Sequence, residues 1–278
     1  MTKFKKKNVL VTGGSSYIWS HITKNYNKKY NFIYLINKTK IKNVKISNLV
    51  TTYSIFKKVK SIDSIIHLAG ADDFYKKSIS NHKLDTFIKK VSIKFNVNKI
   101  IFTSSNRVYE GVNKKIIDEN VLCKPISPYG KNKLNTEKLI KSLPSKSVIL
   151  RLPSVISKKF SKGLIFRILN DIKKNKEVEI FNPNSLFNNI ISADELIKII
   201  FYSLDNIDNK NLIINISANS PIKFIKVVKF LLRKGKSLAQ FKVIHTIDNS
   251  KYYSTKLQNK FFKNKISSVK KSLAKLFT

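Results

Sequence analysis

Tyr129 and Lys133 lie four residues apart in the segment S-P-Y-G-K-N-K of residues 127–133, and this spacing could support acid–base chemistry. On a helix, residues four apart share one face. A lysine ammonium beside a phenol favours the phenolate and moves the tyrosine pKa from about 10 toward neutral. The pair therefore predicts that Tyr129 accepts a proton at cellular pH. An ordinary exposed helix face is the alternative interpretation, because lysine is abundant throughout the chain.

The chain has only seven glycines, so each marks a place where a side chain is hard to accommodate. Five of them follow expected strand ends or adjoin the Tyr/Lys pair: Gly13, Gly14, Gly70, Gly111 and Gly130. In an open α/β sheet, ligands bind at the carboxyl ends of the strands. The glycines therefore favour a ligand site at that edge, although each one alone is also compatible with a simple turn.

The elements that would position this site alternate along the chain. Short apolar runs predict strands at residues 8–12, 32–36, 44–47, 64–68, 99–103 and 148–152. Helical patterns run from the first strand to about residue 28, and over 81–95, 162–173, 193–203, 221–233 and 269–276. Ser127 is a suitable N-cap, with Pro128 at the first position of the helix that carries the Tyr/Lys pair. Alternating strands and helices predict an α/β fold with a doubly wound parallel sheet.

The composition limits the class of protein. The net charge is +39, but only four of the 55 basic residues are arginine and the lysines are dispersed, so we expect no specific nucleic-acid partner. A polyanion-binding protein is kept as a separate hypothesis, and weak, salt-sensitive binding to polyanions is expected in any case. The single cysteine, Cys123, fits a reducing, cytoplasmic location. No apolar run reaches 18 residues, so no membrane span is expected. Residues 1–7 lead into a strand rather than a signal peptide. The histidines and the cysteine show no spacing of metal ligands.

Several segments, in order, resemble the extended short-chain dehydrogenase/reductases of the NAD-dependent epimerase/dehydratase family. The glycine segment, residues 12–21, resembles the T-G-x-x-G-x-x-G loop, and its sequence is similar to that of UDP-glucose 4-epimerases. The other matches are residues 67–70 to H-L-A-A, 102–109 to S-S-x-x-V-Y-G, 127–133 to S-P-Y-x-x-x-K, 151–155 to R-x-x-N-V and 188–196 to R-D-F-V-H-V-D-D-L. The resemblance extends to about residue 215.

The resemblance implies a Rossmann-type dinucleotide-binding domain of residues 1–155, with a contribution from about 188–216. A smaller C-terminal substrate lobe would comprise residues 156–187 and 217–278. The implied activity is that of an NAD(P)-dependent nucleotide-sugar epimerase, an isomerase that transiently oxidises and re-reduces a ring carbon. Two alternatives stay open: an NADPH-dependent keto-sugar reductase, and a Rossmann-fold binding protein without redox chemistry. A homodimer is expected on the resemblance alone.

The resemblance also assigns roles to individual residues. Tyr129 would be the acid/base, Lys133 would lower its pKa and hold the nicotinamide ribose, and Ser105 would hydrogen-bond the reacting hydroxyl. For Ser105, a serine that caps a strand end is the alternative. The implied cofactor-binding residues are Gly13, Ser15, Ser16, Tyr17, Ile18, Asn37, Leu68, Ala69, Gly70 and Lys133. The implied substrate-binding residues are Asn106, Arg107 and Ser154.

Three departures from the family pattern affect the cofactor. Ser16 and Trp19 stand where the loop has its second and third glycines. The third glycine permits close helix–strand packing, so an indole must displace the helix or fill a gap left by smaller neighbours. These two residues motivate the binding-protein alternative. Asn37 replaces the aspartate that accepts from the adenosine ribose, and Lys38 and Lys40 are near, so NADP stays an alternative to NAD.

Other departures affect the reaction and the substrate. Asn106 and Arg107 stand where sugar dehydratases of the family have an acidic pair, so elimination chemistry is disfavoured. Asp63 matches an acidic family position but equally suits a turn or cap, and His67 is expected to be a packed strand residue. The sugar is not identified by the resemblance, because three further family positions have changed: Ser154, Asn188 and Ser192.

Overall fold

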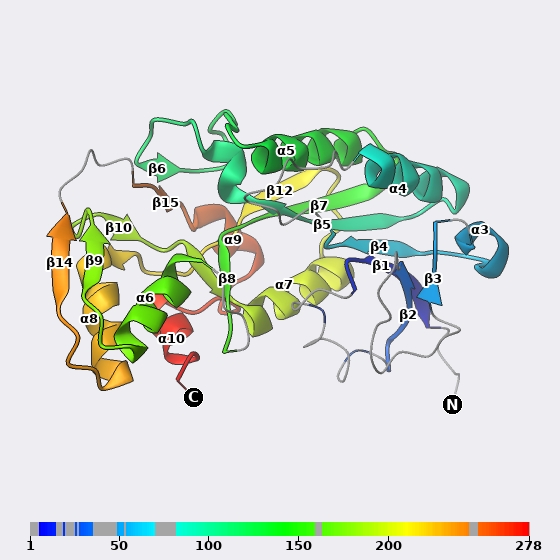
Figure 1. Ribbon diagram of the computed structural model, residues 1–278. Helices are drawn as coiled ribbons and strands as arrows, with labels where there is room; N and C mark the ends of the chain where they lie inside the picture. The colour runs from blue at the N-terminus through cyan, green and yellow to red at the C-terminus, as the bar shows by residue number, and fades with distance from the viewer. Residues whose placement is uncertain are drawn as a thin grey trace. The chain divides into compact units, whose positions relative to one another are not determined.

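The structure is a computed structural model that describes residues 6–14, 19, 26, 28–35, 49–52, 54–69, 82–158, 163–244 and 250–277. The chain divides into two compact units (Figure 1). The first unit comprises Met1–Gly111, Cys123–Arg151 and Ile197–Ile214. The second comprises Val112–Leu122, Leu152–Leu196 and Asn215–Thr278. This division is set by chain contacts; the assignment of cofactor binding to one part and substrate binding to the other stays a prediction.

A seven-stranded sheet forms the centre of the first unit, in the order β12-β7-β5-β4-β1-β2-β3. The pairs β1–β2, β2–β3, β1–β4 and β4–β5 are parallel. The chain moves outward from β1 to β3 and returns to place β4 on the other side of β1, which is the order of a Rossmann-type doubly wound sheet. The strands are β1 (Lys7–Thr12), β2 (Tyr30–Leu35), β3 (Leu49–Val50), β4 (Ser64–His67), β5 (Lys99–Ser105), β7 (Lys146–Leu152) and β12 (Leu212–Asn215).

Helices α4 (His82–Lys94) and α5 (Pro128–Lys141) cover one face of this sheet (Figure 1). The core under them combines alternate strand residues with apolar helix residues, as the two-residue period of a strand requires. Its largest members include Leu10, Ile65, Ile100, Phe102, Ile149, Phe87, Ile88 and Ile140. The same alternation directs Ser104 of β5 and Arg151 of β7 toward α5, a placement that matters for the site.

Aromatic side chains pack on the opposite face of the sheet. Trp19 is 1% exposed, and its ring contacts Phe32 and Tyr34 of β2 edge-on, with ring centroids at 5.1 and 5.8 Å. Phe201 of α7 (Ala193–Asn206) lies at 6.4 Å. Among the described residues its ring contacts include these three aromatic side chains; the expected displacement of the helix after β1 concerns residues that lie largely outside the described part of the chain. The indole is accommodated by edge-to-face packing, a favourable geometry for aromatic pairs.

Most expected elements of the first unit are confirmed, with small shifts. The helix after β1 falls largely, and the strand at residues 44–47 entirely, outside the described residues; β3 was not expected. A short helix α3 (Ile55–Lys58) precedes β4, and a single 3-10 turn, η2 (Asn106–Tyr109), follows β5. Asp63 accepts the backbone N–H of Asn8 at 2.7 Å, at the amino end of the sheet. Asp63 therefore connects the starts of β1 and β4, at the end of the sheet opposite the carboxyl ends of its strands.

The second unit is built from short helices and two- to four-residue strands. Its apolar core lies between α6 (Leu164–Lys173), α8 (Phe224–Gly235) and α10 (Val269–Ala274). Helix α8 begins at Phe224 rather than at residue 221, because the preceding two residues pair as a strand. A further helix is α9 (Lys256–Phe261). The strand pairs are β6 (Ile116–Ile117) with β15 (Tyr252–Tyr253), β8 (Ser154–Ile156) with β11 (Ile190–Ser192), β9 (Val178–Phe181) with β14 (Phe241–Ile244), and β10 (Leu186–Phe187) with β13 (Ile222–Lys223).

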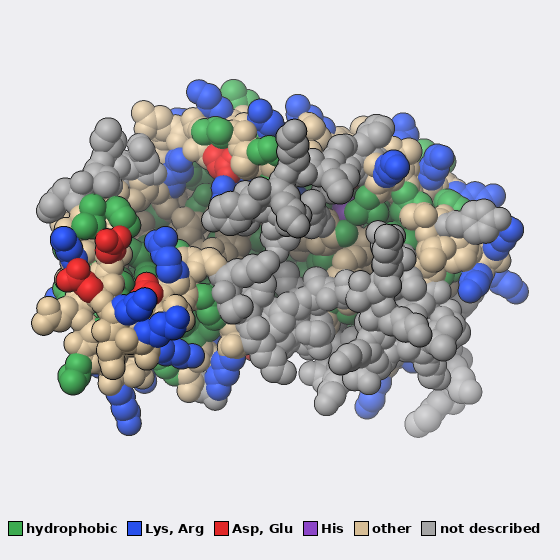
Figure 2. All heavy atoms as spheres, viewed as in Figure 1, with side chains coloured by type: hydrophobic (Ala, Val, Ile, Leu, Met, Phe, Trp, Pro, Cys, Tyr) green, Lys and Arg blue, Asp and Glu red, His purple; other side chains and the backbone are tan. Residues whose placement is uncertain are grey.

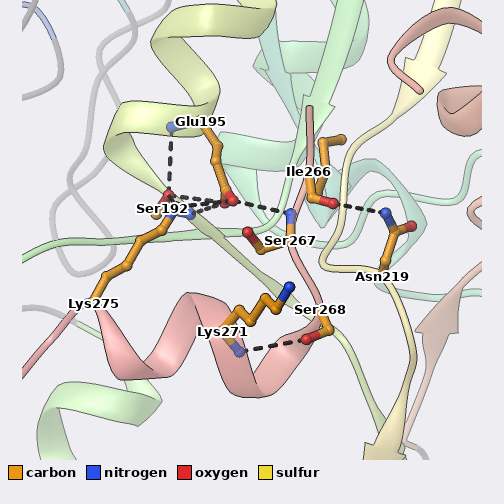
Figure 3. Close-up of polar contacts among 8 residues, drawn as sticks. All are labelled: Ser192, Glu195, Asn219, Ile266, Ser267, Ser268, Lys271 and Lys275. Atoms are coloured by element: carbon orange, nitrogen blue, oxygen red, sulfur yellow. Dashed lines mark hydrogen bonds and ion pairs between the residues drawn. The ribbon is translucent and has the colours of Figure 1, made fainter. Parts of the chain in front are cut away.

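A buried carboxylate connects the start of α7 to the C-terminal segment of this unit (Figure 3). Glu195 Oε2 accepts from the hydroxyl of Ser192, the residue before α7, at 2.8 Å, so the two side chains cap the helix start together. Glu195 Oε1 accepts the backbone N–H of Ser267 at 3.0 Å and pairs with Lys275 Nζ at 2.9 Å. One carboxylate therefore holds α10 and the loop residue Ser267 before it against the start of α7.

The surface carries the basic character of the composition. Figure 2 shows Lys and Arg side chains spread over the visible face, with few acidic side chains among them. Within the part of the chain that the structure describes, no helix is both long and apolar enough to cross a bilayer.

Candidate active site

The Tyr/Lys pair lies in the first turns of α5. Ser127 caps this helix, since its hydroxyl accepts the Gly130 N–H at 3.1 Å, and Pro128 occupies the first turn as predicted. Lys133 is 3% exposed, and its ammonium donates to the Thr103 carbonyl of β5 at 2.8 Å. The same ammonium lies 5.8 Å from the centroid of the half-buried Tyr129 ring. The structure therefore brings a buried cation, fixed to a strand end, beside the candidate phenol.

Ser105 is the last residue of β5, and the structure shows the capping contact for it. Its hydroxyl accepts the backbone N–H of Arg107 at 3.3 Å, at the start of η2. This contact uses one lone pair of the hydroxyl and leaves it able to donate. The catalytic role of Ser105 stays a prediction, as do those of Tyr129 and Lys133.

The ends of β1 and β4 come very close together. Gly13 has φ +72°, and a Cβ there would lie 2.8 Å from the backbone nitrogen of Ala69. Leu68 N donates to the Thr12 carbonyl at 3.1 Å, and Ala69 N to the Thr12 hydroxyl at 3.4 Å. Both the positive φ of Gly13 and the close approach of the Ala69 backbone require a glycine at this position. The turn after β1 thus presents bare backbone at the switch point of the sheet, where ligands of this fold class bind.

His67 is a packed strand residue, as expected. Its ring stacks on Phe102 with centroids 5.0 Å apart, and its Nδ1 lies 2.6 Å from the Thr12 hydroxyl. Burial, and then the charge of Lys133, lower the pKa of His67 to about 3. The imidazole is therefore neutral at cellular pH and supports the end of β1 as an uncharged hydrogen-bonding group.

A buried ion pair lies beyond Lys133 on the same side of α5. Glu137 accepts two hydrogen bonds from Arg151 of β7 and one, at 2.5 Å, from the Ser104 hydroxyl. Arg151 also donates to the hydroxyl of Tyr109. Burial would lower the pKa of Arg151, but the hydrogen bonds and charge of Glu137 raise it above its ordinary value. The guanidinium stays charged, and the group connects α5, β5, η2 and β7.

The sequence analysis missed Glu137, although a signal for it exists. The chain has only 16 acidic residues, and Glu137 stands four residues after Lys133 on the same helical face. An acid at that spacing, on the face that covers the sheet, is buried and needs a cationic partner. Arg151, in the strand that follows α5, is that partner.

The predicted substrate residues differ in their surroundings. Asn106 and Arg107 form the start of η2, and Arg107 Nη1 pairs with Glu110 Oε1 at 2.5 Å. Ser154 lies in the second unit, exposed at the start of β8, where it pairs with Ile190. Their contact with substrate stays a prediction.

Six of the predicted cofactor residues lie outside the residues that the structure describes: Ser15, Ser16, Tyr17, Ile18, Asn37 and Gly70. Among the described residues, no group of three or more His, Cys, Asp or Glu side chains could hold a metal ion.

The chain is similar to a protein-family model and to several known proteins. The model of the NAD dependent epimerase/dehydratase family matches residues 9–217. A protein of Methanocaldococcus jannaschii, provisionally named as a UDP-glucose 4-epimerase, is 28% identical over 237 residues, covering 75% of this chain and 76% of that protein.

Among the solved structures that share the fold are two 4-epimerases. One is a UDP-N-acetylglucosamine 4-epimerase from Methanobrevibacter ruminantium, with a TM-score of 0.75, 21% identity and coverage of 98% of this chain and 97% of that one. The other is a UDP-glucuronic acid 4-epimerase from Bacillus cereus in complex with UDP-glucuronic acid and NAD, with a TM-score of 0.74, 19% identity and coverage of 97% and 98%.

Proposed function

Because the chain belongs to the NAD dependent epimerase/dehydratase family, we propose that it is an NAD-dependent nucleotide-sugar epimerase. The observation that carries this proposal is the buried Lys133 ammonium, which donates to the Thr103 carbonyl and lies 5.8 Å from the ring of Tyr129. A fixed cation at that place stabilises a phenolate more than a phenol. The structural relatives that bind NAD and UDP-sugars support the choice of cofactor and substrate class.

The residues at the ends of β1 and β4 fit a dinucleotide. The close contact of Gly13 with the Ala69 backbone fixes the turn from which the loop after β1 starts. This turn lies at the switch point of the sheet, where dinucleotides bind in folds of this class. In this proposal Gly13, Leu68, Ala69 and Lys133 hold the cofactor, together with the predicted residues of the loop after β1. When bound, NAD would supply a reversible acceptor for the hydride of one ring carbon of the sugar.

The protein residues would handle the proton and the hydroxyl. Tyr129, held as the phenolate by the Lys133 ammonium, takes the proton of the reacting hydroxyl and carries it as a neutral phenol until it returns it. Ser105 donates a hydrogen bond to the oxygen that loses this proton. Neutral His67 beside Lys133 adds no competing positive charge. We assign the cofactor to the first unit and the sugar to the second, and the homodimer stays a prediction.

The test begins with the purified protein. We expect a denatured sample to release NAD that mass spectrometry identifies, and we expect turnover of UDP-sugars without added cofactor. Turnover that requires added NADPH would instead identify the keto-sugar reductase. Absence of both bound dinucleotide and turnover would support the binding-protein alternative.

Tyr129→Phe tests the assigned acid/base directly. General acid–base catalysis contributes about 10²- to 10⁴-fold, so kcat should fall by that factor while the bound NAD is kept. Tyr252→Phe, in β15 of the second unit, is the matched control and should leave kcat within about threefold of wild type. Turnover of Tyr129→Phe within a few-fold of wild type would show that the mechanism is wrong.

A further inference from the structure

The Glu110 carboxylate gathers four donors at the end of η2. Its Oε2 accepts the backbone N–H of Ser127 at 2.6 Å and that of Ile126 at 3.1 Å. Its Oε1 accepts the Ser127 hydroxyl at 2.9 Å and Arg107 Nη1 at 2.5 Å. Three of these four donors belong to the two residues immediately before α5. The intrahelical bonds of α5 do not reach these N–H groups, so an outside acceptor must satisfy them.

Arg107 connects this carboxylate to Ser105. Its backbone N–H donates to the Ser105 hydroxyl at 3.3 Å, while its guanidinium donates to Glu110. One residue therefore contacts the candidate catalytic serine through its main chain and the acceptor of the tyrosine helix through its side chain.

The start of α5 also touches η2 without a side chain between them. A Cβ on Gly130 would lie 2.7 Å from the Arg107 carbonyl oxygen and 3.1 Å from Pro125 Cβ. The Gly111 N–H donates to the Lys124 carbonyl at 2.8 Å, which fixes the loop that leads to α5. Tyr129 belongs to this first turn, so a shift of the turn against η2 moves Tyr129 with it. Lys133 is held separately, by its hydrogen bond to the Thr103 carbonyl.

Glu110 is a departure from the family pattern. Counted without a gap, it stands at the glycine of S-S-x-x-V-Y-G, and Arg107 stands at one of the variable positions. A glycine has no side chain that could accept from the residues before α5. Glu110 therefore supplies an acceptor at a position where the motif has none.

We infer that Glu110, held by Arg107, is a positioning residue that fixes the first turn of α5 against η2 and so places Tyr129 relative to Ser105 and Lys133. This inference rests on the proposed function for its consequence in catalysis. It also assigns Arg107 a role within the protein, in place of the substrate contact predicted from the sequence.

The carboxylate is suited to this task because it stays charged. Burial alone would raise the pKa of Glu110, but the hydrogen bonds from Arg107 and Ser127, with the charge of Arg107, hold it below its ordinary value. Hydrogen bonds to an ionised acceptor are about twice as strong as neutral ones.

The test compares Glu110→Gln, Glu110→Gly and Arg107→Met with the control Glu179→Gln, which alters an exposed carboxylate of β9. Hydrogen–deuterium exchange of peptides over residues 125–133 should become at least tenfold faster in the first three variants, while the thermal midpoint changes little. With UDP-sugars, kcat should fall at least tenfold with KM within about threefold. Arg107→Lys should recover part of both effects, because it restores a cation beside Glu110.

The outcomes separate this inference from the proposed function. Unchanged exchange over residues 125–133 would overturn the positioning role, whatever the activity. Faster exchange with unchanged kcat would also overturn it, since the helix start would then be merely structural. A raised KM in Arg107→Met with normal exchange would return Arg107 to substrate binding. If the wild-type protein has no turnover, the proposed function fails, and the exchange measurement alone decides whether Glu110 holds α5.

Discussion

Glu137 of α5 and Arg151 of β7 form a bidentate ion pair that is almost completely buried. The two bonds, Nε to Oε1 and Nη2 to Oε2, measure 3.0 and 2.7 Å. Ser104 donates to the Glu137 carboxylate, and Arg151 donates to the Tyr109 hydroxyl. The pair thus joins the helix that carries Tyr129 to the strands that lie under it, and every member of the group has a partner.

The first prediction concerns this pair. Glu137→Leu alone should lower the free energy of unfolding by about 3–5 kcal/mol, because it leaves the Arg151 charge buried without its partner. The double variant Glu137→Leu/Arg151→Met should recover most of that loss, since neither charge is then buried. Urea unfolding followed by circular dichroism measures both. A double variant no more stable than the single one would contradict this account.

The region around α5 was predicted well because its signals are local. A serine cap and a proline at the first helical position define the start, and the observed helix begins at Pro128. The glycine signals at Gly13 and Gly130 were also informative, since a Cβ at either position would meet backbone within 2.8 Å. The cap and the proline lie next to the helix start that they specify, whereas each glycine marks a contact whose partner, Ala69 or Arg107, is known only from the structure.

Other features depend on segments far apart in the chain, and the sequence could not specify them. Strand β6 pairs with β15, more than 130 residues later, and neither has more than two residues. The acceptor at Glu110 is recognisable only once Ser127 is known to lie beside it. The neighbours of Trp19 come from β2 and α7, so its fit could not be judged from the glycine pattern alone.

The second prediction concerns Trp19. Trp19→Gly, which restores the glycine of the family loop, should destabilise the protein by about 3–5 kcal/mol, because a large buried side chain leaves a cavity among three aromatic rings. Urea unfolding followed by circular dichroism is the measurement, since the variant lacks the chain's only tryptophan. Tyr252→Phe serves as the control. Unchanged stability would mean that the packing around the indole contributes little.

The third prediction concerns His67 and pH. The folded pKa is about 3 and the ordinary value is 6.5, so between these values the unfolded chain binds a proton that the folded chain does not. Stability therefore rises with pH across this window, by up to about 1.4 kcal/mol per pH unit from this group. His67→Gln keeps a polar partner for Thr12 but cannot titrate. Its unfolding free energy should change less steeply than that of wild type between pH 4 and 6.5, and parallel curves would refute the assignment.

The last prediction separates the partners of Glu195 (Figure 3). Lys275→Met should cost only about 0–1 kcal/mol, because the Lys275 side chain is 38% exposed and such ion pairs are weak. Glu195→Gln should cost about 1–3 kcal/mol at pH 7, because a neutral amide forms weaker hydrogen bonds with the Ser267 N–H and the Ser192 hydroxyl than the carboxylate does.

The pH dependence of the Glu195→Gln effect distinguishes a charged acceptor from a merely well-packed side chain. Burial would raise the pKa of Glu195, but hydrogen bonds from Ser267, Lys275 and Ser192 and the charge of Lys275 hold it below the ordinary 4.5. A depressed carboxyl pKa stabilises the fold above the unfolded value, and this stabilisation is lost as the pH falls through the folded value. The difference between wild type and Glu195→Gln should therefore be constant from pH 7 to about 5 and shrink below pH 4.5. A difference that persists unchanged to pH 3 would show that the charge of Glu195 contributes nothing to holding α10 against α7.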